Sequence, residues 1–106
     1  MQNSKYDLEE RTYKFAKRIN EYVKKLPKNM VNIEIGKQLI RSGGSIGANY
    51  IEANESFRRK ETKESRYWLN LSEPNDNQIS EKELLIKETN ELMKIFGSII
   101  EKSKSF

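Results

Sequence analysis

The chain has 106 residues and a formal net charge of +4; charged residues make up 34% of it and apolar residues 35%, so it suffices for one domain with a modest core. It contains no cysteine and no histidine, which excludes disulfides, thiolate metal sites and the commonest general base and transition-metal ligand. No apolar run approaches the roughly 18 residues that span a membrane. We therefore expect a cytoplasmic, non-enzymatic protein without membrane association, cofactor or metal ion.

The first predicted helix covers about residues 7–26. Hydrophobic positions recur there at steps of three and four, which is the period of one helix face. Asp7 and Glu10 have the spacing of a capping box, and Pro27 ends the helix. The residues expected to face the core are Leu8, Thr12, Phe15, Ile19, Tyr22 and Leu26.

The second predicted helix covers about residues 33–57 and contains four glycines. Each mid-helix glycine costs about 1 kcal/mol relative to alanine, so a break at Gly43-Gly44 is one interpretation. Gly36, Gly43 and Gly47 share a face, which favours an unbroken helix that another backbone approaches closely. Asn49 falls on the mostly apolar face, where a polar side chain can set register or oligomeric state. We expect these residues, together with Trp68, to form a structural or oligomer seam.

Nine consecutive polar residues, 58–66, follow without a glycine or proline. Either a turn near residues 56–60 precedes a short third helix at 60–71, or the second helix continues to Leu71. Residues 72–80 form the clearest loop. The last helix covers about 81–102, with Ser80 and Glu83 at capping-box spacing. The sequence predicts an all-α, antiparallel up-down four-helix bundle with a shortened third helix, or with helices two and three fused.

Charge is distributed unevenly along the chain. Residues 11–66 contain 14 basic and 6 acidic residues, whereas residues 72–101 contain 3 basic and 7 acidic ones. This polarity can steer a polyanion to one face, hold two parts of the bundle together, or join subunits.

Two basic segments are candidates for binding nucleic acid, because cations neutralise phosphates and exposed aromatic rings stack on unpaired bases. The candidates on the outer face of the first helix are Lys14, Lys17, Arg18 and Lys25. Those in the polar run are Arg58, Arg59 and Lys63, which precede Tyr67 and Trp68. The alternatives are a solvated charged surface and a Trp68 buried at a helix interface.

Residues 35–42 (IGKQLIRS) and 45–53 (SIGANYIEA) resemble the signature of the four helix bundle protein family. That family includes the proteins encoded in intervening sequences of bacterial large-subunit ribosomal RNA genes, and the accessory proteins of diversity-generating retroelements are more distant relatives. Residues 64–69 and 83–98 resemble the third and fourth helices of the family.

The resemblance implies an up-down bundle that assembles into a ring-like homopentamer, with a basic surface that associates with RNA or a reverse transcriptase. The chain departs from the family pattern between Glu55 and Glu61, where the third helix looks several turns too short; fusion with the second helix would open the bundle and invite domain swapping. We expect a non-enzymatic homo-oligomer that associates with RNA. The alternative is a scaffold that docks an acidic partner protein.

Overall fold

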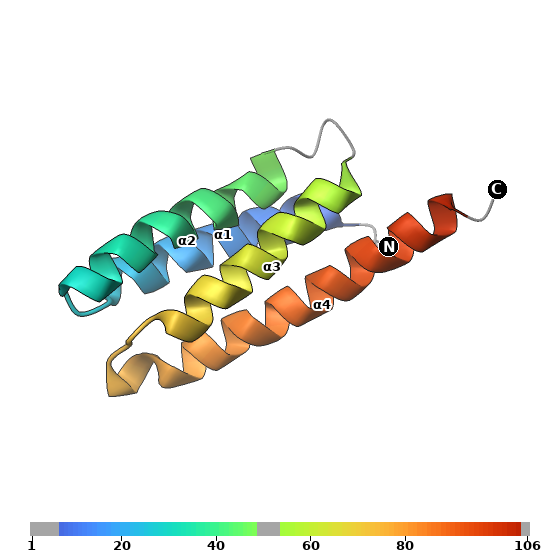
Figure 1. Cartoon of the computed structure of the whole chain (residues 1–106). Helices are drawn as coiled ribbons and strands as arrows, with labels where there is room; N and C mark the ends of the chain where they lie inside the picture. Colours follow the sequence, from blue (N-terminus) through green and yellow to red (C-terminus); the bar gives the residue numbers. More distant parts are fainter. Residues whose placement is uncertain (1–6, 49–53, 105–106) are drawn as a thin grey trace.

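The chain folds into antiparallel helices that pack side by side (Figure 1). The structure is a computed structural model that describes residues 7–48 and 54–104. In these ranges the elements are α1 (Leu8–Lys25), α2 (Met30–Ala48), α3 (Glu55–Leu71), the short 3₁₀ turn η3 (Asp76–Gln78) and α4 (Ile79–Ser103). α2 packs against α1 and α3, and α3 packs against α4. The all-α four-helix bundle predicted from the sequence is confirmed.

The core is formed by apolar stripes of α1, α2 and α4, to which α3 adds Leu69 and the partly buried Trp68. It is interrupted by buried hydroxyl groups, such as that of Thr12, which donates to the Leu8 carbonyl at 2.7 Å. All six residues predicted to line the first helix are buried. The buried apolar residues are Leu8, Phe15, Ile19, Tyr22, Leu26, Ile35, Leu39, Ile46, Leu69, Leu85, Leu92 and Phe96.

The polar run at residues 58–66 is helical, and the third helix is not shortened. α3 begins at Glu55, and its 17 residues compare with 18 in α1 and 19 in α2. Asn54 caps it, because its side-chain oxygen accepts a hydrogen bond from Phe57 N at 3.0 Å. The prediction failed because it followed apolar residues, whereas the first buried positions of this helix are polar. These positions are Arg58, Glu61, Thr62 and Ser65.

α2 and α3 are separate helices that lie side by side, so the fused alternative is wrong. Arg41 donates to Glu61 at 3.2 Å and to Glu64 at 2.8 Å, and the Ser42 and Ser65 hydroxyls lie 2.9 Å apart. In one continuous helix, residues this far apart in sequence would be separated by about 30 Å.

The observed helix bounds differ from the predicted ones mainly around α2. This helix begins at Met30, three residues before the predicted start, because Asn29 Oδ1 accepts from Asn32 N at 2.8 Å. Its predicted end, residue 57, belongs to α3. Asn49 lies outside the described residues, so its predicted role stays a prediction.

Both predicted capping boxes are absent from the described residues. Asp7 stands at the N-cap of α1 but makes no side-chain capping hydrogen bond. Ser80 is the second residue of α4, because η3 leads directly into that helix at Ile79, two residues before the predicted start. The loop before η3 uses Asn75 and Gln78 instead, with Asn75 N donating to Gln78 Oε1 at 3.3 Å.

The glycines of α2 allow a close approach to α1, and the helix continues through Gly43-Gly44. A Cβ on Gly36 would lie 2.9 Å from Val23 Cγ1, which no real Cβ tolerates without movement. Cβ atoms on Gly43 and Gly47 would lie 3.3 Å from Ile19 and 3.0 Å from Thr12. The predicted seam at Gly36, Gly43 and Gly47 thus lies within one chain.

One buried amide joins the two turns at the same end of the bundle. Asn32 Nδ2 donates to the carbonyls of Pro27 and Glu73 at 2.9 Å each, and its Oδ1 accepts from Glu73 N at 2.9 Å. This amide satisfies backbone groups in both turns, and it fixes the start of α2 against the end of α3.

Candidate nucleic-acid interface

The two arginines of α1 reach α4. Arg11 donates through Nε and Nη2 to the Glu88 carboxylate at 2.7 and 3.0 Å, and Nη2 also approaches Glu91 at 3.5 Å. Arg18 donates to both carboxylate oxygens of Glu81 at 3.1 and 3.2 Å. The basic and acidic parts of the sequence therefore hold α1 and α4 together, and Arg18, a predicted phosphate contact, is engaged in this pairing.

The lysines of α1 remain on the outer side of the helix. Lys14 forms an exposed ion pair with Glu10 at 3.1 Å, and hydrogen bonding to this ammonium lowers the pKa of the Glu10 carboxyl. Lys17 Nζ stands 5.6 Å from the ring centroid of Tyr13, as in a cation–π contact. Lys25 is exposed as well. These three predicted residues can meet a ligand, whereas the Arg18 guanidinium is paired with Glu81.

Arg58 is buried, and this contradicts its prediction as a nucleic-acid contact. Its side chain is 0% exposed, and Nη1 donates to Glu55 at 2.9 Å. A phosphate cannot reach this guanidinium while α3 stays packed. Arg58 sits in the basic run of the sequence, but the helical period turns it toward the interior.

A basic face covers the outer side of α3 and α4. Arg59 extends over α4, where its Nε would lie 3.5 Å from a Cβ on Gly97. Arg66 Nη1 donates to Asn90 Oδ1 on α4 at 2.7 Å. Lys63 is exposed between these two arginines. The predicted residues Arg59 and Lys63 are thus brought together with a third cation of the same helix.

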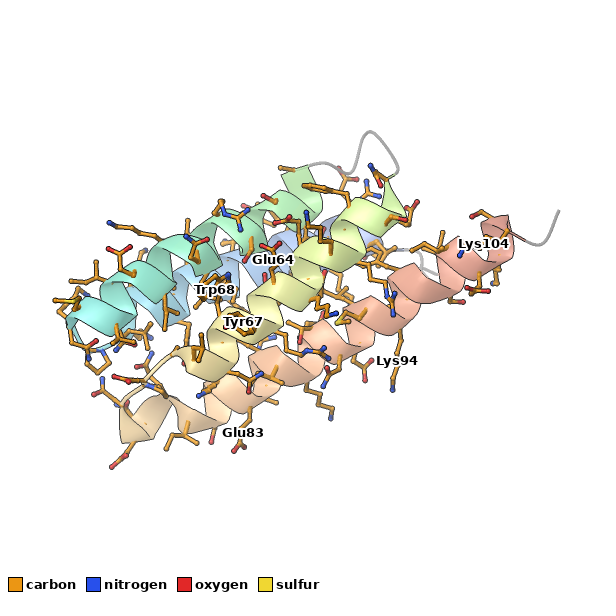
Figure 2. All side chains as sticks on the ribbon, viewed as in Figure 1. Glu64, Tyr67, Trp68, Glu83, Lys94 and Lys104 are labelled. Atoms are coloured by element: carbon orange, nitrogen blue, oxygen red, sulfur yellow. The ribbon has the colours of Figure 1, made fainter. Side chains whose placement is uncertain are left out.

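Two lysines of α4 extend this surface. Lys87 and Lys94 stand three residues before and four after Asn90, so they share its side of the helix. Both are exposed, and Lys94 projects from α4 in Figure 2. Sequence reasoning missed them because they lie in the acidic part of the chain. We call the five residues the α3–α4 basic face: Arg59, Lys63, Arg66, Lys87 and Lys94.

The cations of the α3–α4 basic face make no ion pair within residues 7–48 and 54–104. This distinguishes them from Arg11, Lys14, Arg18 and Lys24 of α1, each of which pairs with a carboxylate. The charge of the α3–α4 basic face is therefore the less neutralised of the two.

The two neighbouring aromatic residues of α3 have different environments. Tyr67 is 59% exposed, whereas Trp68 is half-buried and packs against the core, as the second interpretation predicted. Figure 2 shows both side chains on α3, and their rings meet edge to face with centroids 5.1 Å apart. Only Tyr67 offers an open ring beside the basic face.

The described residues carry no group of three or more acidic side chains suited to a metal ion. In the same part of the chain, no helix combines the length and the apolar character needed to cross a membrane.

The sequence and the structure were compared with known proteins. No protein-family model, curated protein or solved structure matches the chain significantly. The family resemblance therefore stays an expectation, and the functional argument depends on the geometry described above.

Proposed function

We propose that the protein is a non-enzymatic helical bundle that associates with RNA by charge, through the α3–α4 basic face. The observation that carries this proposal is the gathering of five cations from two helices, without an intrachain ion pair in the described residues, beside the exposed ring of Tyr67. The absence of histidine and cysteine from the sequence supports a role without catalysis.

The arrangement favours recognition of the RNA backbone over recognition of base sequence. Arg59 and Arg66 are seven residues apart, so the face extends about 10 Å along α3 alone. Exposed lysines act as point charges on phosphates, and an aromatic ring stacks on any unpaired base. We infer that the preferred ligand is single-stranded or looped RNA, bound with little sequence preference.

Salt dependence tests the electrostatic part of the proposal. Five phosphate contacts on a single strand predict a slope of about −3.5 for the logarithm of the association constant against the logarithm of salt concentration. Fluorescence anisotropy with a labelled 20-nucleotide single-stranded RNA measures this slope. Absence of binding at low salt, or affinity that is independent of salt, would reject RNA association by charge.

Charge reversal identifies the face that binds. We expect a variant with Lys63→Glu, Lys87→Glu and Lys94→Glu to lose RNA binding. The matched control reverses Lys14, Lys17 and Lys25 on α1, which changes the net charge equally. If only the control variant loses binding, the interface is the outer face of α1, and the α3–α4 assignment is wrong.

We further propose that the protein is a homo-oligomer, with the pentamer that the family resemblance implies. Large apolar side chains that stay exposed, such as Met30 and Leu71, support self-association of a chain with a small core. Light scattering tests this directly, since a pentamer has five times the mass of the 12.5 kDa chain. A monomer at high concentration would reject it.

A further inference from the structure

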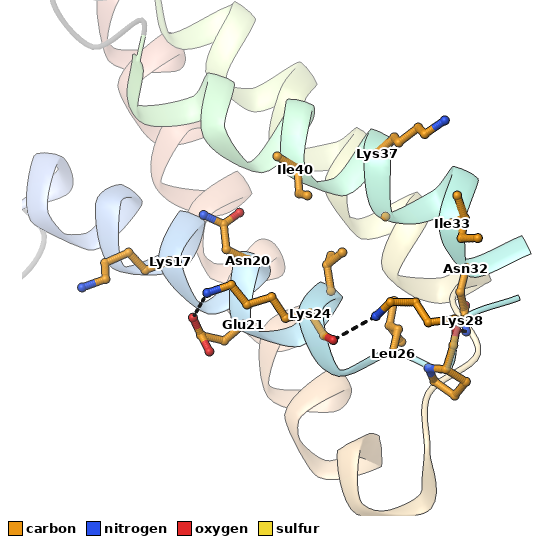
Figure 3. Close-up of a pocket in the computed structure, with 13 residues that line it drawn as sticks. Lys17, Asn20, Glu21, Lys24, Leu26, Lys28, Asn32, Ile33, Lys37 and Ile40 are labelled. Atoms are coloured by element: carbon orange, nitrogen blue, oxygen red, sulfur yellow. Dashed lines mark hydrogen bonds and ion pairs between the residues drawn. The ribbon is translucent and has the colours of Figure 1, made fainter.

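A groove lies between α1 and α2, two helices that contribute nothing to the α3–α4 basic face. It has a volume of about 650 Å³ and lies along both helices toward the turn that joins them (Figure 3). Apolar residues and glycine line its floor, and lysines line its rim. The floor residues are Val23, Leu26, Pro27, Ile33, Gly36 and Ile40.

Two of the floor residues are exposed to solvent. Ile33 is 48% exposed and Ile40 is 49% exposed, although both are branched apolar side chains on one stripe of α2. Gly36 brings α2 against Val23 of α1, so the two walls join at the bottom without a gap. Apolar area of this kind is unfavourable in water, and a partner that covers it gains free energy in proportion to the area buried.

Four lysines surround this floor: Lys17, Lys24, Lys28 and Lys37. Glu21 is the acidic residue of the lining, and Lys24 pairs with it at 3.0 Å, which lowers the pKa of the Glu21 carboxyl. Lys37 likewise pairs with Glu34 of α2 at 3.3 Å. Exposed pairs of this type are weak, and Lys17 and Lys28 add two further cations, so the rim keeps an excess of positive charge. The charge selects an occupant that carries carboxylates at the edges of its contact surface.

This charge argues against a second copy of the chain as the occupant. Two grooves that met face to face would oppose lysines to lysines. The acidic helix α4 supplies little complement, because most of its carboxylates are already paired. Glu81, Glu88 and Glu91 pair with arginines of α1 and Glu101 with Lys104, which leaves Glu83 without an ion pair among the described residues. A partner with its own acidic residues satisfies the rim without breaking these pairs.

Gly44 continues the same stripe of α2, four residues after Ile40. A Cβ added there would meet nothing within 4 Å, unlike one at Gly36, Gly43 or Gly47. Gly44 therefore destabilises the helix relative to alanine, and packing among the described residues does not require a glycine at this position. The missing side chain leaves room for a second backbone to approach α2 at this end of the stripe.

We propose that the α1–α2 groove docks an amphipathic helix of another protein, apolar on its inner face and acidic on its flanks. Ile33 and Ile40 are about 10 Å apart along α2, which corresponds to two turns of a docked helix. Apolar residues at positions i, i+3, i+4 and i+7 of the partner fill the floor, and its flanking glutamates meet the lysine rim. This site is independent of the RNA proposal, because the two surfaces belong to different helices.

Three labelled synthetic peptides of 18 residues test the proposal with the full chain, by fluorescence anisotropy. The first is an amphipathic helix with a leucine stripe flanked by glutamates. The second replaces these glutamates with lysines, and the third scrambles the first. We expect the first peptide to bind at least about tenfold more tightly than the other two. Equal binding of the scrambled or the basic peptide, or no binding of the first, overturns the proposal.

Two variants and a matched control locate the site. Ile40→Asp removes the apolar floor, and the double variant Lys24→Glu with Lys37→Glu reverses the rim; each should weaken peptide binding at least about tenfold. Leu84→Asp is the control, because Leu84 is 52% exposed on α4. Circular dichroism verifies that each variant is folded. Unchanged binding by folded variants of both kinds overturns the assignment.

Two further outcomes would assign the groove to an occupant other than a partner helix. If the 20-nucleotide RNA displaces the acidic peptide, and Ile40→Asp abolishes RNA binding, the groove is an RNA site and the docking proposal is wrong. If Ile40→Asp converts an oligomer to a monomer, the groove is covered by a second copy of the chain, which also overturns it. An unchanged mass, together with loss of peptide binding, supports the partner helix.

Discussion

Arg11 and Glu88 form a two-point hydrogen-bonded ion pair that joins the first helix to the last, with Arg11 Nε and Nη2 at 2.7 and 3.0 Å from the two carboxylate oxygens. Hydrogen bonding to Glu88 raises the pKa of Arg11, so the guanidinium is charged at all working pH values. The planar fork of arginine makes both bonds at once. The pair closes the bundle by joining two residues that are 77 positions apart in sequence.

The replacement Arg11→Lys tests the contribution of this geometry. We expect it to lower the free energy of unfolding by about 1 kcal/mol, because lysine keeps the charge but cannot donate two parallel bonds. Urea unfolding followed by circular dichroism measures the difference. Lys14→Ala is the control, since its exposed pair with Glu10 should contribute under about 0.5 kcal/mol. If the Arg11→Lys variant is as stable as the original chain, the positive charge at position 11 is sufficient and the two-point hydrogen bonding contributes nothing to stability.

Alanine substitution should have opposite effects at two glycines of α2. Gly44→Ala should raise the free energy of unfolding by about 1 kcal/mol, because the new methyl group meets nothing within 4 Å and the helix becomes intrinsically more favourable. Gly36→Ala should lower it by about 1 kcal/mol, since its Cβ would stand 2.9 Å from Val23 Cγ1. Thermal unfolding of both variants measures the signs. Equal signs would contradict the close approach of α1 to Gly36.

The buried Arg58 should matter for stability and not for RNA affinity. Arg58→Ala should lower the free energy of unfolding by about 3 kcal/mol, because it empties a fully buried position and removes the 2.9 Å ion pair with Glu55. Arg59→Ala, next in sequence but exposed, should change stability by less than about 0.5 kcal/mol. Denaturant unfolding measures stability, and anisotropy with the labelled RNA measures affinity. Full stability together with lost RNA binding in Arg58→Ala would contradict the burial of this residue.

We expect ionisation of the buried Tyr22 hydroxyl to lower the free energy of unfolding at alkaline pH. Burial raises the pKa of its hydroxyl above the ordinary value of 10.0. The hydroxyl lies 2.7 Å from Ser72 Oγ, within hydrogen-bond distance. Since Ser72 Oγ donates to the Leu69 carbonyl at 2.7 Å, its oxygen is left to accept a hydrogen bond from the Tyr22 hydroxyl. An ionised Tyr22 loses that bond inside the core.

The sign of this pH dependence follows from proton binding. Below about pH 10 both folded and unfolded chains hold the Tyr22 proton, so the contribution is fully present. As pH rises from there through the higher folded pKa, only the unfolded chain releases the proton, and the free energy of unfolding falls. Urea unfolding between pH 8 and pH 11 measures the slope. Tyr22→Phe should show a shallower decline above pH 10, and an identical slope would reject the assignment to Tyr22.

The sequence alone determined the all-α class of the fold and the core-facing side of the first helix. The steps of three and four residues from Leu8 to Leu26 identified the inner face of α1, and all six of its positions are buried. The seam of Gly36, Gly43 and Gly47 was also visible, because residues on one helix face recur at a fixed period whatever they contact. These features are local, so the chain order encodes them directly.

Only the tertiary structure decided which charges are free. Arg58 and Arg59 are neighbours in sequence, but one is buried beside Glu55 and the other extends over Gly97. Lys87 and Lys94 join the basic face from an acidic segment, because the packing of α3 against α4 brings Asn90 to Arg66. Such pairings depend on the distance between helices that are remote along the chain. A one-dimensional charge pattern does not contain that distance, and for this reason the candidate interface had to be assembled from the folded helices.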